Sequence, residues 1–158
     1  MKTTKEVPIK DKHLLIAVDQ TENSKRAVLY VADFLGGLPG FRVTILSIIP
    51  EPEEDFFNTD EERVSWTRKK TDETNAMLDG YRQILIKEGF EPEKVRVRAC
   101  VNEVKSLSEA ILDTRCEPPC CTVVVGRHHR TKTEEFLYGS TSSKLIREAR
   151  NCAVWVVE

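Results

Sequence analysis

The sequence predicts an α/β fold, a doubly wound parallel sheet of five strands with helices on both faces. Two observations carry this prediction. Short apolar runs alternate along the chain with longer stretches whose apolar residues recur at helical spacing. The runs are rich in valine and isoleucine, and the first is continuously apolar, as in a strand covered on both faces. Such alternation is typical of a parallel sheet whose crossover helices cover both sides.

Five segments are predicted to be strands. The first ends at Asp19, the second is closed by Pro50 and the fourth is followed by Gly126. The third alternates apolar residues with Arg96 and Arg98, which indicates an edge strand with one wet face. The five segments are 14–18, 42–49, 94–100, 121–125 and 152–157.

The first two helices have clear start and stop signals. Thr21 or Asn23 caps the first, and glycines at 36–37 end it. Thr59 and Glu62 have the spacing of a capping box, and the helix they open is expected to run to about residue 87. The first helix is expected to bury Ala27, Val28, Val31, Phe34 and Leu35, and the second Met77, Leu78, Tyr81, Ile84 and Leu85.

The two later helices are shorter. Asn102 or Ser106 starts one, whose expected buried face is Val104, Leu107, Ala110 and Ile111. The other follows the polar run 139–143 and carries Leu145, Ile146 and Ala149.

The connection between the second strand and its helix is strongly acidic. Residues 51–62 hold seven carboxylates and the aromatic pair Phe56–Phe57, which is either a partner contact or is folded under the loop. Trp66 and Trp155 are interpreted as packing or interface residues rather than as stacking platforms.

Length and charge exclude several classes of function. The chain has 158 residues, 24 basic and 26 acidic side chains and a net charge of −2, which excludes nucleic-acid binding through bulk positive charge. Its apolar runs fall far short of the roughly 20 residues of a membrane-spanning helix, and residues 1–12 lack the apolar core of a secretory signal. We expect a flexible segment at 1–12, one domain over 13–158 and a cytoplasmic location.

A ligand site is expected beyond the carboxyl ends of the strands, where the strand order of a doubly wound sheet reverses. Asp19, Ile48 and the loop after Gly126 lie there. The run 139–143, Gly-Ser-Thr-Ser-Ser, precedes a helix, so its N–H groups and hydroxyls suit an anion. It also suits a simple helix cap, and Asp19 also suits a turn.

Four segments carry a family resemblance. Residues 14–24, 123–127, 135–144 and 152–157 together resemble the universal stress protein family over nearly the whole chain. The resemblance implies five parallel strands in the order 3-2-1-4-5, a fold like that of the adenine nucleotide alpha hydrolases. It also implies a homodimer joined through the last strand, 152–157.

The family's ATP-binding branch has the motif G-x2-G-x9-G-[ST], and this chain keeps its spacing with His129 in place of the second glycine. The resemblance implies that Asp19 holds the ribose or a metal and that Ile48 presents its backbone to adenine. Residues 17–18 border the base. The implied nucleotide-binding residues are Ala17, Val18, Asp19, Ile48, Gly126, His129, Gly139, Ser140, Thr141 and Ser142.

Two consequences of His129 compete. If its position requires positive φ or a bare backbone, the imidazole adds about 1–3 kcal/mol of strain or blocks the phosphates. If it swings outward, it joins Arg127, His128, Arg130 and Lys132 in a basic rim that attracts a polyphosphate. The rim is equally consistent with a solvated loop.

The sequence therefore predicts a protein that binds ATP or a related adenine nucleotide, with Mg²⁺ as a possible companion, and that is not an enzyme; slow hydrolysis of bound ATP stays open. It contains no P-loop lysine motif and no nucleophile elbow. The alternative is an interaction protein whose nucleotide site His129 has closed.

A thiol redox or metal sensor is the least favoured alternative. The five cysteines include Cys116, Cys120 and Cys121, but they lack paired metal-binding spacing. We expect reduced thiols that are buried or half-buried.

Overall fold

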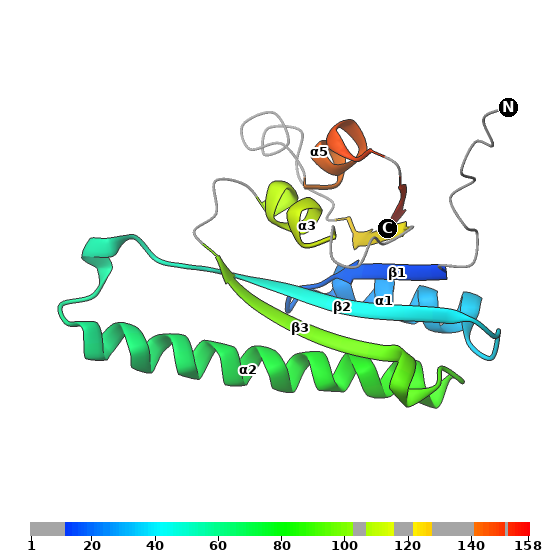
Figure 1. The fold of residues 1–158 in the computed structure, drawn as a ribbon, viewed down its shortest axis with the longest axis horizontal. Coiled ribbons are helices and arrows are strands. Elements are labelled where there is room, and N and C mark those ends of the chain that lie inside the picture. The colour runs from blue at the N-terminus through cyan, green and yellow to red at the C-terminus, as the bar shows by residue number, and fades with distance from the viewer. Residues whose placement is uncertain (1–11, 103–106, 116–121, 128–140, 151) are drawn as a thin grey trace, which may run out of the picture.

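The computed structural model describes residues 12–102, 107–115, 122–127, 141–150 and 152–158. Figure 1 shows a sheet with helices packed beside it. All paired strands of the sheet are parallel. The elements in chain order are β1 (Lys12–Ala17), α1 (Glu22–Leu35), β2 (Phe41–Pro50), the 3₁₀ turn η1 (Glu54–Phe56), α2 (Asp60–Lys87), the 3₁₀ turn η2 (Pro92–Lys94), β3 (Val95–Asn102), α3 (Leu107–Arg115), β4 (Thr122–Gly126), α5 (Thr141–Glu148) and β5 (Ala153–Val157).

The strand order is β3-β2-β1-β4-β5, which confirms the predicted fold class and order. β3 is an edge strand, as its alternating sequence predicted, and β5 forms the other edge. The strand bounds differ from the predicted ones by one or two residues. Val18 lies just past β1, yet its N–H still donates to the Leu46 carbonyl over 2.8 Å, so the ladder continues by one bond.

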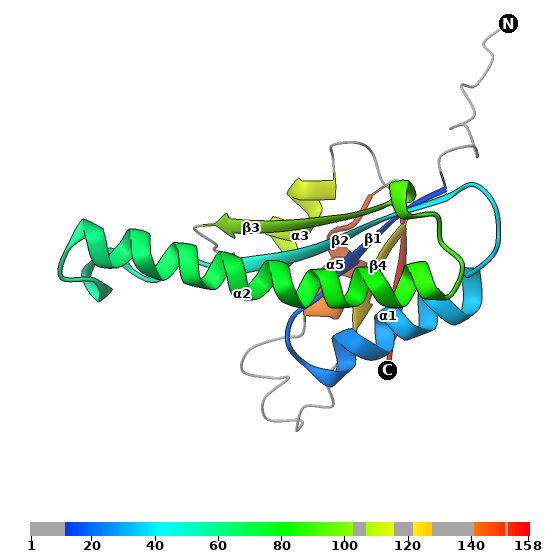
Figure 2. The ribbon, with the colours of Figure 1, turned by 90° about the horizontal axis from the view of Figure 1, so that it is seen from below.

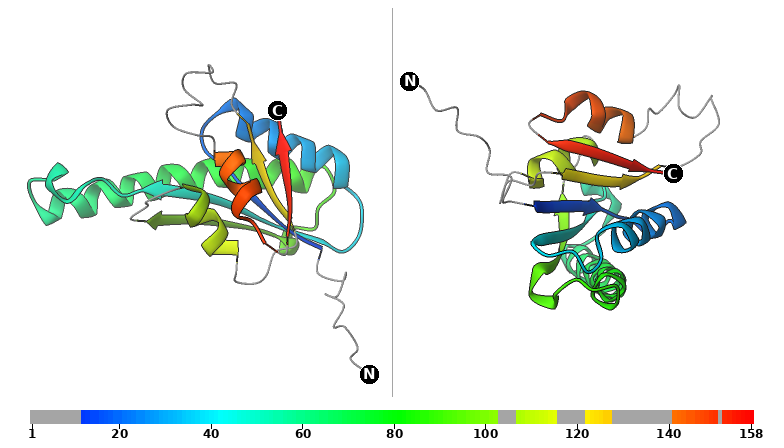
Figure 3. Two further views of the ribbon diagram at one scale, coloured as in Figure 1. Left: turned by 90° about the horizontal axis from the view of Figure 1, so that it is seen from above. Right: turned by 90° about the vertical axis from the view of Figure 1, so that its right-hand side faces the viewer.

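Helices cover both faces of the sheet (Figure 3). Leu14 and Ile16 of β1 pack with α1 and α2, and Leu15 packs with Ile111 of α3 and Leu145 of α5. β1 is thus buried on both faces because alternate side chains of a strand point to opposite sides. This explains its continuously apolar sequence.

α1 begins as predicted, with Thr21 as its N-cap accepting a hydrogen bond from the Ser24 N–H over 3.4 Å. One core prediction was wrong: Phe34 is 59% exposed. It stacks on Tyr30 and meets the edge of Trp155 instead, because α1 overhangs β5 and no strand lies beyond that edge. Ile146 of α5 is likewise exposed, while its neighbour Leu145 is buried.

α2 has 28 residues and measures about 42 Å at 1.5 Å per residue. Figure 2 shows its first turns running past the end of β3. Thr59 caps it by accepting from the Glu62 N–H over 3.1 Å, and Glu62 accepts in return from the N–H of Asn58 rather than of Thr59. The predicted stripe packs on the sheet, with Leu78, Tyr81 and Leu85 buried. No described helix has the length and apolar character needed to span a membrane.

Candidate functional site

The candidate site lies at the carboxyl edge of the sheet, beside the central strand β1. The chain leaves β1 into α1 on one face, and the connection after β4 leads to α5 on the other face. The strand order therefore reverses between β1 and β4, which is where open α/β sheets bind ligands. Asp19, two residues after β1, and Gly126, the last residue of β4, lie at this point.

Asp19 holds the turn between β1 and α1. Its Oδ1 accepts hydrogen bonds from the Thr21 N–H over 2.9 Å, from the Ser24 hydroxyl over 2.8 Å and from the Thr21 hydroxyl. These bonds close an Asx-type turn that leads into the helix cap. The turn role considered from the sequence is therefore present. The Asp19 side chain remains exposed at the sheet edge.

A cavity of about 300 Å³ opens next to Asp19. It has three walls: the turn after β1, the last residues of β2, and one side of α2. The structure thus brings Asp19 and Ile48 together, as predicted. The lining residues are Asp19, Gln20, Ser47, Ile48, Ile49, Pro50, Trp66, Lys70, Thr74 and Met77.

Ala17 and Val18 lie beside this cavity in the backbone ladder. Ala17 pairs with Leu46 on one side and with Val125 on the other. Val18 is buried and donates its N–H to Leu46. The central strand therefore leads directly into Asp19 through these two residues.

The α2 wall was not predicted as part of the site. Trp66, Lys70 and Thr74 are spaced four residues apart, so they lie along one row of the helix. The Phe57 ring packs on Trp66 with 5.7 Å between ring centroids, and Phe56 contacts Phe57 while staying 66% exposed. Of the aromatic pair in the acidic loop, Phe57 is thus half-buried against Trp66 and Phe56 is exposed.

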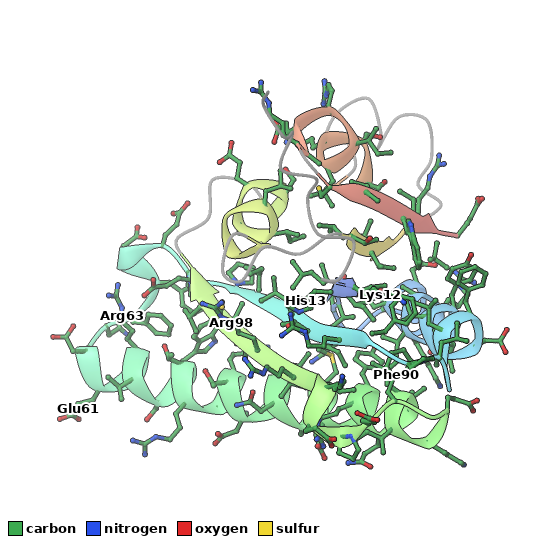
Figure 4. The ribbon with its side chains drawn as sticks, turned by 45° about the vertical axis from the view of Figure 1, so that its right-hand side comes forward. Lys12, His13, Glu61, Arg63, Phe90 and Arg98 are labelled. Atoms are coloured by element: carbon green, nitrogen blue, oxygen red, sulfur yellow. The ribbon has the colours of Figure 1, made fainter. Side chains whose placement is uncertain are left out.

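An ion pair connects the first turn of α2 to the residue that follows β2. Arg63 contacts Glu51 with 3.9 Å between Nη1 and Oε1. In Figure 4, Arg63 lies between the first turns of α2 and the end of β2, while Glu61 points away to solvent. The cavity wall formed by α2 is therefore connected to β2 at its outer end.

Tyr81 links α2 to the turn after β1. Its hydroxyl donates to the Asp19 carbonyl over 3.2 Å. Burial raises the pKa of Tyr81, and the nearby carboxylates of Asp19 and Glu22 raise this pKa further. The sequence places Tyr81 on the buried face of α2, and a buried tyrosine needs a hydrogen-bond partner for its hydroxyl. The sequence does not indicate which group that partner is.

Gly126 ends β4 where α1 begins. A Cβ atom added to Gly126 would lie 2.3 Å from the Asn23 carbonyl oxygen and 2.5 Å from its carbon. The glycine is therefore required for the close approach of the first turn of α1. The family resemblance implied that Gly126 binds the nucleotide; in the structure the backbone of Asn23 occupies the space that a side chain at Gly126 would fill.

The remaining predicted residues divide into two groups. Thr141 and Ser142 begin α5, and the Ser142 side chain is buried. His129, Gly139 and Ser140 lie outside the described residues, as do His128, Arg130 and Lys132 of the proposed basic rim. Arg127 is exposed, and its N–H donates to the Val157 carbonyl over 2.8 Å.

The described cysteines and carboxylates form no metal-binding cluster. Cys116, Cys120 and Cys121 fall outside the described part of the chain, and Cys100 and Cys152 are half-buried free thiols. Within the described ranges, no three His, Cys, Asp or Glu side chains are grouped to hold a metal ion.

Three solved structures show the same fold at low sequence identity. A universal stress protein family member from Burkholderia pseudomallei has a TM-score of 0.72 and 15% identity, covering 94% of this chain and 97% of its own. A universal stress protein in complex with cAMP has a TM-score of 0.70 and 15% identity, covering 94% of this chain and 97% of its own. The Archaeoglobus fulgidus universal stress protein in complex with dAMP has a TM-score of 0.60 and 21% identity, covering 92% of this chain and 96% of its own.

Sequence comparisons complete the assignment. Curated proteins yield no significant match. The model of the universal stress protein family matches residues 11–158, nearly the whole chain. The chain therefore belongs to the universal stress protein family.

Proposed function

We propose that this protein binds an adenine nucleotide at the carboxyl edge of its sheet and acts in a stress response or its regulation. One observation carries the proposal: the cavity beside β1 brings together Asp19 and Ile48, the two residues expected to contact ribose and base. Relatives crystallised with cAMP and dAMP support it. With about 300 Å³, the cavity is at the small end of the range for small-molecule sites, roughly 300–1,000 Å³. It suits a base and part of its sugar.

Ile48 would meet the base through its backbone. The Leu46 carbonyl, two residues earlier, accepts from Val18 on the β1 side of β2. Because backbone groups two residues apart in a strand point to the same side, the N–H and C=O of Ile48 face the space beyond the end of β1. A base lying there can pair its edge with these groups.

The phosphates of ATP would extend toward the start of α5 and Arg127. α5 returns the chain from the carboxyl edge to the start of β5, so its first turn, with Thr141 and Ser142, faces that edge. Helix N-termini favour anions there. Mg²⁺ is held in many sites by one or two carboxylates and substrate phosphates, and Asp19 is an exposed carboxylate at this edge.

We propose binding rather than catalysis as the role of this site. Among the described residues that line the cavity, Asp19 and Lys70 are the two that ionise. Asp19 already holds the turn, and Lys70 Nζ lies 3.9 Å from Glu73 Oε2. This arrangement fits a sensor or carrier of nucleotide.

The test is calorimetry of purified protein with ATP and magnesium, together with analysis of nucleotide released on denaturing gently purified protein. We expect saturable binding near one ATP per chain, and weaker binding of CTP as the matched control. No heat of binding at millimolar ATP, combined with no released nucleotide, would refute nucleotide binding.

A second surface supports the proposed homodimer. Tyr30 and Phe34 of α1 and Trp155 of β5 line a groove of about 620 Å³ along the edge strand. Phe34 is largely exposed there, and Leu38 nearby is also exposed. An apolar patch beside a strand edge favours pairing with another chain. We propose that a second copy covers it.

A further inference from the structure

Two buried hydroxyls line the cavity beside β1. Ser47 on β2 is 5% exposed and Thr74 on α2 is 7% exposed. Within the described part of the chain, neither side chain has a hydrogen-bond partner. Buried polar groups nearly always have a hydrogen-bond partner, and one without a partner destabilises the fold. The burial of both the Ser47 and the Thr74 hydroxyl therefore needs a physical reason.

Both hydroxyls interrupt apolar stripes. On β2, Ser47 lies between Ile45 and Ile49, which are buried on the same face of the strand. On α2, Thr74 lies four residues before the buried Leu78. An alanine or a valine would fit these stripes without an unpaired hydroxyl. In both stripes the unpaired hydroxyl lies where the stripe reaches the cavity, which points to a polar ligand atom there.

The same row of α2 carries an aromatic ring. Trp66 lies two turns before Thr74 and also lines the cavity. The Phe57 ring, 5.7 Å away between centroids, packs on it and restricts its movement. The α2 wall therefore offers an aromatic ring and, two turns further along, the hydroxyl of Thr74, which lines the same cavity as Ser47.

We propose that Ser47 and Thr74 hydrogen-bond the edge of the nucleotide base while Trp66 packs against its ring. This inference rests on the proposed nucleotide binding and adds the residues that hold the base. A base has donors and acceptors in its plane, which hydroxyls satisfy because they both donate and accept. Its faces are apolar and stack on aromatic side chains. α2 is thus a base-binding element.

The test measures ATP affinity by calorimetry and melting temperature without ligand for Ser47→Ala, Thr74→Val and Trp66→Ala. Val64→Ala, an exposed α2 position that does not line the cavity, is the matched control. We expect Ser47→Ala and Thr74→Val each to weaken ATP binding about 5- to 10-fold, and Trp66→Ala about 10-fold. The two hydroxyl variants are also expected to raise the melting temperature, because each removes an unpaired buried group.

The outcomes separate this inference from the proposed function. If the wild type binds ATP and all three variants bind it equally well, α2 does not hold the base and the proposed function stands. If the wild type binds no ATP, both the proposed function and this inference are refuted. Trp66 is the only tryptophan in a Trp155→Phe variant, so quenching of its fluorescence by ATP provides a second measurement in an intact cavity. Calorimetric binding without any fluorescence change would overturn the contact with Trp66.

Discussion

Single residues at the sheet edge serve the fold as well as the site. Asp19 closes the turn into α1 with one carboxylate oxygen and stays exposed beside the cavity. Gly126 admits the backbone of Asn23, and its ligand role was only inferred from the sequence. Substituting either residue therefore alters stability as well as binding. Loss of nucleotide affinity in such variants has to be compared with their unfolding free energies.

Replacing Gly126 with alanine is expected to lower the free energy of unfolding by about 1–3 kcal/mol, because the new Cβ overlaps the Asn23 carbonyl. Gly80→Ala is the matched control. A Cβ at Gly80 meets nothing within 4 Å, and alanine favours the helix interior by about 0.5–1 kcal/mol. Urea unfolding measures both. Equal stability of the wild type and Gly126→Ala would contradict the close approach.

Tyr81→Phe is expected to lower the free energy of unfolding by about 0.5–1.5 kcal/mol at pH 8, through loss of the hydrogen bond to Asp19. The raised pKa of Tyr81 means that the folded state favours the protonated phenol. Its contribution is complete below the ordinary pKa of about 10 and is lost as pH rises toward the folded-state pKa. Urea unfolding from pH 8 to about 11 should show the difference between wild type and variant shrinking. A constant difference would contradict the shift.

At the scale of elements, α2 gives the cavity a wall that the sequence did not predict. Its first turns extend past β3 and, with η1, place the aromatic residues Phe57 and Trp66 beside the end of β2. The Thr59 cap and the contact of Arg63 with Glu51 fix where this extension starts. The cavity therefore has a wall whose position depends on the length of one helix.

α1 and β5 form the other notable pair of elements. We expect the wild type to sediment as a dimer and Phe34→Ser to shift it toward monomer, because the serine removes the most exposed ring of the groove. Ile146→Ser is the control, since Ile146 is exposed on α5 and does not line the groove. Sedimentation velocity distinguishes the species. An unchanged dimer in Phe34→Ser, or a monomeric wild type, would contradict the proposed interface.

For the whole molecule, periodicity was sufficient to predict the layers. Continuous apolar runs identified the buried strands, and alternating arginines identified β3 as an edge. The strand order came from the family resemblance. Phe34 was misplaced because helical spacing gives a helix face but not how far the sheet beneath it extends. That extent depends on tertiary packing.

The candidate site could be predicted only in part. The rule for doubly wound sheets located Asp19, Ile48 and Gly126, all at strand ends. Ser47 and Thr74 were missed because a serine in a strand and a threonine in a helix are ordinary in sequence, and Trp66 was interpreted as a packing or interface residue. Their significance appears only when β2 and α2 pack together and leave both hydroxyls buried beside one cavity.

Nucleotide binding in the cavity beside β1 is tested most directly by two-dimensional NMR of ¹⁵N-labelled protein during addition of ATP and magnesium. The largest shift changes are expected at the amides of Asp19 and Ile48 and at the indole N–H of Trp66, with smaller changes at Trp155. No change up to millimolar ATP, or changes confined to the groove of Tyr30, Phe34 and Trp155, would contradict this assignment.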